Sequence, residues 1–273
     1  MLRRLLRAAL GPPRPGSPAP SVQALPRPRV SARAYPLGRT SLREWPDTAF
    51  DASFLRAARD GSPEALREVV REVHPGLYAL TPLSPERLRD LSAEIGRFHA
   101  WCRANGAEVD PPNSMNTYGA AFDFLGVDSA PLRAAVAPFA RLLFTPQGGA
   151  AIDEDHTFIV SYARGYDIDL GFHADDAEVT LNLCLGDTFA GGDLYFEGQR
   201  CEAHRQTGCS DADRFVWRHT PGVALLHAGA HRHGALPLTE GARNNLIVWM
   251  RSRAYRADPP LDCPPWCAES RAR

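Results

Sequence analysis

The chain has 273 residues, of which 44% are hydrophobic and 23% charged, and this composition is typical of a globular protein rather than a disordered one. All 31 basic residues are arginine, which excludes a Schiff-base lysine and a phosphate-binding loop that ends in lysine. Nine arginines lie in residues 1–43, which hold no acid, so 22 arginines face 32 acidic residues from Glu44 onward. An acidic body argues against nucleic acid as the main partner. No apolar run approaches the roughly 18 residues that cross a bilayer, so no membrane span is expected.

Residues 1–43 have the composition of a targeting segment. A helix over Met1 to Leu10 would place its leucines on one face and three arginines opposite, without any acid, which is typical of organelle presequences. Eight prolines between Gly11 and Pro36 prevent this tract from burying enough surface to order itself. We therefore expect a mitochondrial presequence or disordered tail, with plastid and cytoplasmic locations as the alternatives.

Residues 44–150 are expected to form a helical N-terminal region. The clearest helix runs from Pro85, with Ser84 as its N-cap, along a stripe of apolar residues to a stop at Asn105-Gly106. A second helix is predicted from Pro131 to Phe144. Between them lies a polar loop, Pro111 to Gly119, which could line a substrate groove or serve only as a connector, and its composition does not decide between the two.

From His156 the hydrophobic period changes from about 3.6 to 2. Eight short strands are predicted, without helix-length segments between them: 156–163, 169–175, 178–185, 194–197, 214–218, 223–227, 231–236 and 243–251. Such a run favours an antiparallel jelly-roll over a parallel sheet. We therefore expect an α+β protein with a double-stranded β-helix (jelly-roll) core over residues 151–254, buttressed by the N-terminal helices and followed by a C-terminal tail, 255–273. The strand aromatics Trp217, Trp249, Phe158, Phe196 and Tyr195 are expected in its core, with one or two available to wall a pocket.

His173 and Asp175 are two residues apart in a predicted strand, so their side chains share a face. Two histidines and one carboxylate form the facial triad that leaves coordination positions open on iron(II) in non-haem oxygenases. His227, His231 and His233 all compete for the third position. His231 and His233 have the same strand parity, so parity alone leaves the third ligand open.

A resemblance resolves this choice. His233 is followed ten residues later by Arg243, with Pro237 and Gly241 between them, and this segment resembles the distal histidine and cosubstrate-binding arginine of the prolyl/lysyl-hydroxylase type of 2-oxoglutarate and Fe(II)-dependent oxygenases. The segments 111–119, 171–198 and 233–251 carry the resemblance, whereas residues 1–100 show none.

The resemblance implies a set of roles. The metal ligands would be His173, Asp175 and His233, and Arg243 would bind the distal carboxylate of 2-oxoglutarate, which a planar guanidinium can grip at two points. Tyr162 and Thr180 would be hydrogen-bonding partners of the cosubstrate. Fe(2+), 2-oxoglutarate and O2 are implied, together with L-ascorbate as a reductant. The implied reaction hydroxylates a C–H bond of a prolyl or lysyl side chain in a protein or peptide substrate and releases succinate and CO2.

Two other functions fit the same fold, since a fold does not fix an activity. The barrel could be an inactive binding module or a cupin-like metal-dependent isomerase. An inactive relative usually loses a ligand or the arginine, and this sequence keeps all four residues, which favours the oxygenase. The sequence departs from the lysyl-hydroxylase pattern at Gly234, which follows the distal histidine in place of an acid, and in the polar insert from Gln199 to Asp213, and both departures bear on the substrate.

Six cysteines in a chain of this length are more typical of an intracellular enzyme than of a disulfide scaffold. Cys263 and Cys267 flank Pro-Pro-Trp at a spacing that could bind a metal, but no second cysteine pair lies nearby in the sequence. Whether these two residues bind anything stays open at this point.

Overall fold

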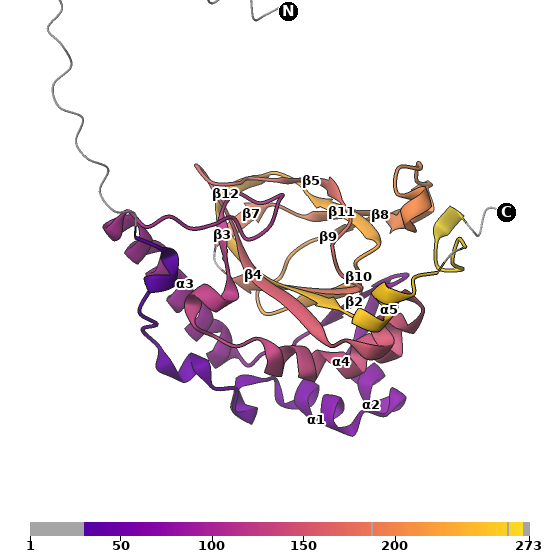
Figure 1. Cartoon of the computed structure of the whole chain (residues 1–273), viewed down its shortest axis with the longest axis horizontal. Helices are drawn as coiled ribbons and strands as arrows, with labels where there is room; N and C mark the ends of the chain where they lie inside the picture. Colours follow the sequence, from indigo (N-terminus) through magenta and orange to yellow (C-terminus); the bar gives the residue numbers. More distant parts are fainter. Residues whose placement is uncertain (1–29, 187, 261, 270–273) are drawn as a thin grey trace, which may run out of the picture.

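Two antiparallel β-sheets face each other, and helices cover the outer face of the larger one (Figure 1). The computed structural model describes residues 30–186, 188–260 and 262–269. Residues 1–29, which include the segment from Met1 to Leu10, lie outside the described residues, so the presequence stays a prediction. Residues 30–43, which were expected to belong to the disordered tail, instead form two 3-10 turns, with Ala32 and Leu42 buried in the hydrophobic core. Within the described part of the chain, no helix combines the length and the apolar character that a bilayer crossing requires.

The helices begin and end largely where local signals place them. They are α1 (Ala52–Asp60), α2 (Pro63–Glu68), α3 (Pro85–Asn105), α4 (Ala130–Phe144) and α5 (Arg253–Ala257). Short 3-10 turns lie at Ala32–Ala34, Thr40–Arg43, Asp47–Ala49, Phe122–Leu125, Thr145–Gln147, Gly149–Ala151, Glu202–His204 and Asp211–Asp213.

The ends of α3 confirm the predicted capping. The Ser84 hydroxyl accepts a hydrogen bond from the Arg87 backbone N–H at 3.2 Å, which satisfies one of the free donors of the first turn. At the other end Gly106 adopts φ +58°, the left-handed conformation that glycine tolerates best after a helix.

The larger sheet has the strand order β1 (Arg71–His74), β2 (Leu77–Leu80), β10 (Ala224–Ala228), β6 (Val179–Gly186), β12 (Leu238–Arg251), β4 (Glu154–Ala163) and β3 (Gly119–Ala121), and β7 (Phe189–Gly191) pairs with one end of β12. The smaller sheet has the order β5 (Leu170–His173), β11 (His231–Ala235), β8 (Leu194–Gln199) and β9 (Arg214–Trp217).

Strands that follow one another along the chain alternate between the two sheets from β4 to β6 and again from β9 to β12. This winding is that of a jelly-roll, so the predicted α+β fold with a double-stranded β-helix core is confirmed. All eight predicted strands are present, with ends that differ by up to five residues.

The sequence pattern did not predict β1, β2, β3 and β7. The hairpin of β1 and β2 lies within the region expected to be helical, and it extends the larger sheet by pairing β2 with β10, with Leu80 opposite Ala224. The run Leu77–Leu80 is too short to show a period, and its partner strand lies far away in the sequence. Its strand conformation therefore depends on tertiary pairing rather than on local preference.

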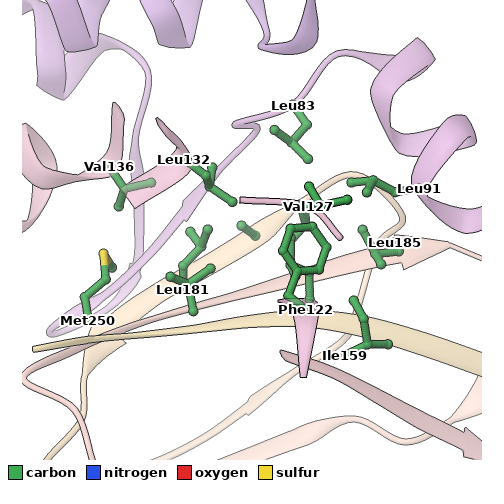
Figure 2. Packing of buried hydrophobic residues seen from close by; sticks show 14 of the residues in the cluster. Leu83, Leu91, Phe122, Val127, Leu132, Val136, Ile159, Leu181, Leu185 and Met250 are labelled. Atoms are coloured by element: carbon green, nitrogen blue, oxygen red, sulfur yellow. The ribbon is translucent and has the colours of Figure 1, made fainter. Parts of the chain in front are cut away.

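The main hydrophobic core fills the space between the helices and the outer face of the larger sheet. Figure 2 shows Leu132 and Val136 of α4 and Leu91 of α3 packed toward Leu181 of β6 and Met250 of β12, and all five are buried. Each fully buried side chain of this kind contributes about 1.5 to 3 kcal/mol. The helices thus buttress the barrel, as the sequence predicts.

Alternation along β12 divides its side chains between this core and the barrel interior. Leu246, Val248 and Met250 belong to the helix-side core. Arg243 and Asn245, of the opposite parity, line an internal cavity between the two sheets. The larger sheet therefore presents an apolar face to the helices and a partly polar face to the cavity.

Candidate metal and cosubstrate site

The register of the smaller sheet places His173 of β5 directly opposite His233 of β11, with their ring centroids 4.4 Å apart. Asp175 follows β5, and its backbone N–H donates to the Gly229 carbonyl at 3.0 Å. A Cβ atom at Gly229 would lie 1.8 Å from the Ala177 carbonyl oxygen, so only glycine allows the two segments to approach this closely. Local backbone packing thus brings the carboxylate to the two rings.

The two histidines present the same nitrogen to Asp175. Nδ1 of His173 donates to the Gly171 carbonyl at 2.8 Å, and Nδ1 of His233 donates to the His231 carbonyl at 2.9 Å. Because a carbonyl only accepts, Nδ1 carries the proton in the neutral ring and the lone pair is on Nε2. These Nε2 atoms lie 3.3 and 3.8 Å from the Asp175 Oδ1 atom, and the three possible ligand atoms are within 4.8 Å of one another.

Burial and the neighbouring rings set the protonation of this group. Burial alone would raise the pKa of Asp175, but His233, His173 and His227 together hold it below its ordinary value. Burial lowers the pKa of His233 to about 3, against the opposing effect of Asp175. The group therefore presents an ionised carboxylate and a neutral distal imidazole, which are the protonation states that bind a metal cation.

The competing histidines have different surroundings. His227, on β10, is fully buried, and its Nε2 lies 3.9 Å from the Asp175 Oδ2 atom without a hydrogen-bond partner. His231 packs edge-on against Phe196, with its ring centroid 5.1 Å away. Of the described residues, the structure groups only His173 and His233 with Asp175 as a possible metal-binding set. The His227 ring therefore lies next to the carboxylate but is not one of the three grouped donors.

Arg243 is buried in the same cavity with 1% of its surface exposed. Its guanidinium donates to the Gly192 carbonyl and lies over the Tyr162 ring, 4.6 Å from the ring centroid. No carboxylate among the described residues lies within the 4.0 Å of an ion pair with it. A buried guanidinium without a counter-ion is costly, so this one provides a strong site for an anionic ligand.

The two remaining candidates, Tyr162 and Thr180, also line the cavity. The Tyr162 hydroxyl accepts a hydrogen bond of 3.3 Å from the Asn116 side-chain amide, and burial raises the pKa of this tyrosine. The Thr180 hydroxyl donates to the Asp175 Oδ2 atom at 2.6 Å. In this structure Thr180 therefore orients the carboxylate, which is a different contact from the cosubstrate bond that the sequence resemblance implies.

Several cavity residues were not singled out from the sequence. The loop from Pro111 to Gly119 contributes Asn113, Met115 and Asn116 to the lining, so it is more than a connector. On the sheet, the Asn245 side-chain amide donates to the Asn182 Oδ1 atom at 2.5 Å. Asn245 has the strand parity of Arg243, and this signal could have identified it.

The donor set fits ferrous iron. Two imidazoles and one carboxylate meet at one side of the cavity, and this combination leaves positions open for a cosubstrate and O2. Arg243, which has no acidic partner in the part of the chain that the structure describes, lines the same cavity, where a dicarboxylate bound at the metal could reach it. All six residues predicted from the sequence are thus brought together in one place.

Comparisons with known proteins extend the resemblance to the N-terminal half. The OGFOD2-like domain matches residues 33–149, where sequence inspection found almost no likeness. The 2-oxoglutarate and iron-dependent oxygenase domain-containing protein CP2 of Arabidopsis thaliana is 37% identical over 246 residues, covering 88% of this chain and 62% of that protein. The 2-oxoglutarate and iron-dependent oxygenase domain-containing protein 2 of Mus musculus is 42% identical over 225 residues, covering 77% of this chain and 61% of that protein.

The chain therefore spans less than two thirds of the length of these relatives. Among solved structures, a Pseudomonas putida prolyl-4-hydroxylase aligns with a TM-score of 0.46 at 18% identity, over 73% of this chain and 99% of that one. The motifs in the segments 111–119, 171–198 and 233–251 also resemble those of the 2-oxoglutarate and iron-dependent oxygenase domain-containing protein 2 of animals, and vertebrate proteins of that name are 34% to 42% identical to the chain. The chain is a homologue of the 2-oxoglutarate and iron-dependent oxygenase domain-containing proteins, as its motifs indicate.

Proposed function

We propose that this protein is an Fe(II)- and 2-oxoglutarate-dependent dioxygenase that hydroxylates a C–H bond. The observation that carries the proposal is the shared cavity, in which a two-histidine, one-carboxylate group occurs together with a buried arginine that has no acidic partner among the described residues. An isomerase with a single metal has no need of the arginine, and a binding module has no need of open metal positions. The names of the homologues support the same activity.

His173, Asp175 and His233 would hold the iron, and Arg243 would bind the distal carboxylate of 2-oxoglutarate. Iron with 2-oxoglutarate supplies the activation of O2, in which one oxygen atom enters the substrate C–H bond and the other enters succinate as CO2 is released. The chain itself holds the ligands in position, keeps the carboxylate ionised through its histidine neighbours and encloses the reacting atoms between the sheets.

For the substrate, we propose a prolyl or lysyl side chain of a protein or peptide. Support comes from the resemblance of the segments 171–198 and 233–251 to the prolyl/lysyl-hydroxylase type. The requirement for L-ascorbate and the mitochondrial location stay predictions from the sequence.

The test uses the full chain with Fe(II), 2-oxoglutarate and air, and succinate release is the first readout. We expect release to fall to background in His173→Ala, which removes a ligand, and to persist in Cys102→Ser, a substitution in helix α3 away from the cavity. Proline- and lysine-containing peptides are then screened by mass spectrometry for the gain of one oxygen atom. If the chain binds iron but releases no more succinate than His173→Ala, the oxygenase activity is refuted and the binding module is favoured. If the hydroxylated product contains no prolyl or lysyl residue, only the proposed substrate is refuted.

A further inference from the structure

Two segments far apart in the sequence meet beside the barrel. One is the insert between β8 and β9, residues 200–213, which is the polar insert of the sequence analysis without Gln199, the last residue of β8. The other is the C-terminal segment after α5. Figure 1 shows them side by side, the insert in orange and the C-terminal segment in yellow. Each contributes two side chains of the types that can ligate zinc, Cys201 and His204 from the insert and Cys263 and Cys267 from the C-terminal segment.

The four donors converge on one point. Their ligand atoms all lie within 4.8 Å of one another. The His204 Nδ1 atom lies 3.2 Å from the Cys201 Sγ, 3.5 Å from the Cys263 Sγ and 3.6 Å from the Cys267 Sγ. A zinc ion with Zn–S bonds of about 2.3 Å and a Zn–N bond of about 2.0 to 2.1 Å in a tetrahedron requires N···S edges of about 3.6 Å. The observed separations are close to this value.

Disulfide chemistry does not explain the convergence. A disulfide would join two of the three thiols and would not account for the position of the third thiol or of the imidazole. Cys209 lies in the same insert, yet it is not part of the group, so the convergence is selective rather than a result of cysteine density. The Cys201 backbone N–H also points to the Cys267 Sγ atom at 3.4 Å, as backbone N–H groups do toward metal-bound thiolates.

The surrounding structure holds both segments in position. Arg200 is 5% exposed, and its guanidinium donates to the Gly208 carbonyl at 2.7 Å and to the Thr207 hydroxyl at 3.1 Å. Arg232 of β11 donates to the Thr207 carbonyl at 2.6 Å. On the other side, the Trp266 indole donates to the Pro146 carbonyl at 2.9 Å. The donors are thus presented by anchored backbone on both segments.

We propose that Cys201, His204, Cys263 and Cys267 form a structural zinc site that ties the C-terminal segment to the insert of the barrel. Four protein ligands of this type close the coordination sphere of zinc, which distinguishes a structural site from a catalytic one. Three thiolates and one imidazole also select zinc over ferrous iron, whose site in the cavity offers nitrogen and oxygen ligands. The two metal sites of the chain thus differ in ligand chemistry.

The first measurement is the metal content of the purified full chain. After desalting without a strong chelator, we expect elemental mass spectrometry to find about one zinc ion per chain, whatever the iron content. Closed sites of this type bind zinc tightly enough to keep it through purification. Replacing zinc with cobalt(II) in the wild-type chain should give sulfur-to-cobalt charge-transfer bands and the visible bands of tetrahedral cobalt. This readout needs no variant and no activity.

Variants then assign the site. Cys263→Ser and Cys267→Ser should lower the zinc content from about one to less than about a tenth per chain, whereas Cys209→Ser, a matched control in the same insert, should keep it. His173→Ala should lose iron and keep zinc, so failure of the iron site cannot be mistaken for failure of the zinc site. Absence of zinc and of cobalt–thiolate bands in the wild type would overturn the proposal, as would a disulfide found between any two of the three cysteines or an equal loss of zinc in Cys209→Ser.

Discussion

Replacing Arg243 with methionine tests whether the buried cation is there for an anionic ligand. The arginine is 1% exposed, and among the described residues its guanidinium contacts the Gly192 carbonyl and the Tyr162 and Phe189 rings, with no carboxylate in ion-pair range. Methionine has a similar length but no charge to desolvate. An unpaired buried charge costs free energy, so its removal should not destabilise the fold. In the absence of ligands, the unfolding free energy of Arg243→Met should be no more than about 1 kcal/mol below that of the wild type.

The same substitution should weaken the binding of 2-oxoglutarate. Hydrogen bonds to a charged group contribute about 1.5 to 3 kcal/mol, which corresponds to about a 10- to 150-fold loss of affinity. At a ligand concentration of about 100 times the wild-type Kd, binding stabilises the wild type by about 2.7 kcal/mol. A variant with about 30-fold weaker affinity gains only about 0.9 kcal/mol at that concentration.

The assay is urea unfolding of the full chain in the absence of oxygen. Mn(II) is present in every sample, and unfolding is compared with and without 2-oxoglutarate. Arg232→Met is the matched control, because Arg232 is 2% exposed but donates to backbone carbonyls of the insert instead of lining the cavity. That control should lose more than about 2 kcal/mol of stability and keep the stabilisation by 2-oxoglutarate. If Arg243→Met is instead destabilised like the control and keeps its response to 2-oxoglutarate, the reasoning about the unpaired cation is wrong.

Three further substitutions test other parts of the structure. Thr180→Val removes the 2.6 Å hydrogen bond to Asp175 and should weaken Mn(II) binding by about 10- to 100-fold, whereas Thr180→Ser should not weaken it. Equal Mn(II) affinities of the two variants, measured by calorimetry, would contradict the role of Thr180 in orienting the carboxylate. Glu94 is fully buried, and although burial raises the pKa of this carboxyl, hydrogen bonds from Tyr35, Arg97 and the backbone hold its pKa below 4.5. The ionised carboxylate should therefore contribute its full stabilisation above about pH 4.5, and this contribution should be lost as the pH falls through the lower folded-state pKa. Glu94→Gln should lower the unfolding free energy by about 2 to 3 kcal/mol at pH 7 and should make the unfolding free energy depend less on pH over this range. Ser84→Ala should cost about 1 kcal/mol through the lost N-cap of α3, and an unchanged denaturation midpoint would show that the cap contributes nothing.

Local signals predicted the parts of the fold that local energetics determine. The α3 helix begins at Pro85 and ends at Asn105 as expected, because its two caps are specified by adjacent residues. The eight barrel strands were recognisable because one face of each packs on a core, which imposes a period of two. For the metal group, two residues of a shared strand face could be chosen from parity, but the third needed the resemblance to a family.

Pairing between distant segments accounts for what the sequence pattern missed. His231 and His233 have the same parity, and the structure groups only His233 with Asp175, because β11 pairs with β5 in a register that puts His233 opposite His173. The β2 strand is formed by its pairing with β10, not by its own composition. Cys263 and Cys267 lacked a second pair in the sequence, because their partners lie about sixty residues away and include a histidine.

The pairing of β8 with β11 connects the two proposed metal sites. Phe196 of β8 lies opposite His233 and stacks on its ring at a centroid distance of 5.2 Å, while Gln199, at the end of the same strand, lies opposite His231. The next backbone N–H, that of Arg200, donates to the Ala230 carbonyl, and Cys201 follows directly. A bound zinc would therefore restrain the end of the strand that supports the distal histidine, although none of its ligands reaches the cavity. If both proposed sites bind their metals, this connection would let the cysteine–histidine group help to position the proposed iron ligands, because a metal ligand is held only as firmly as the backbone behind it.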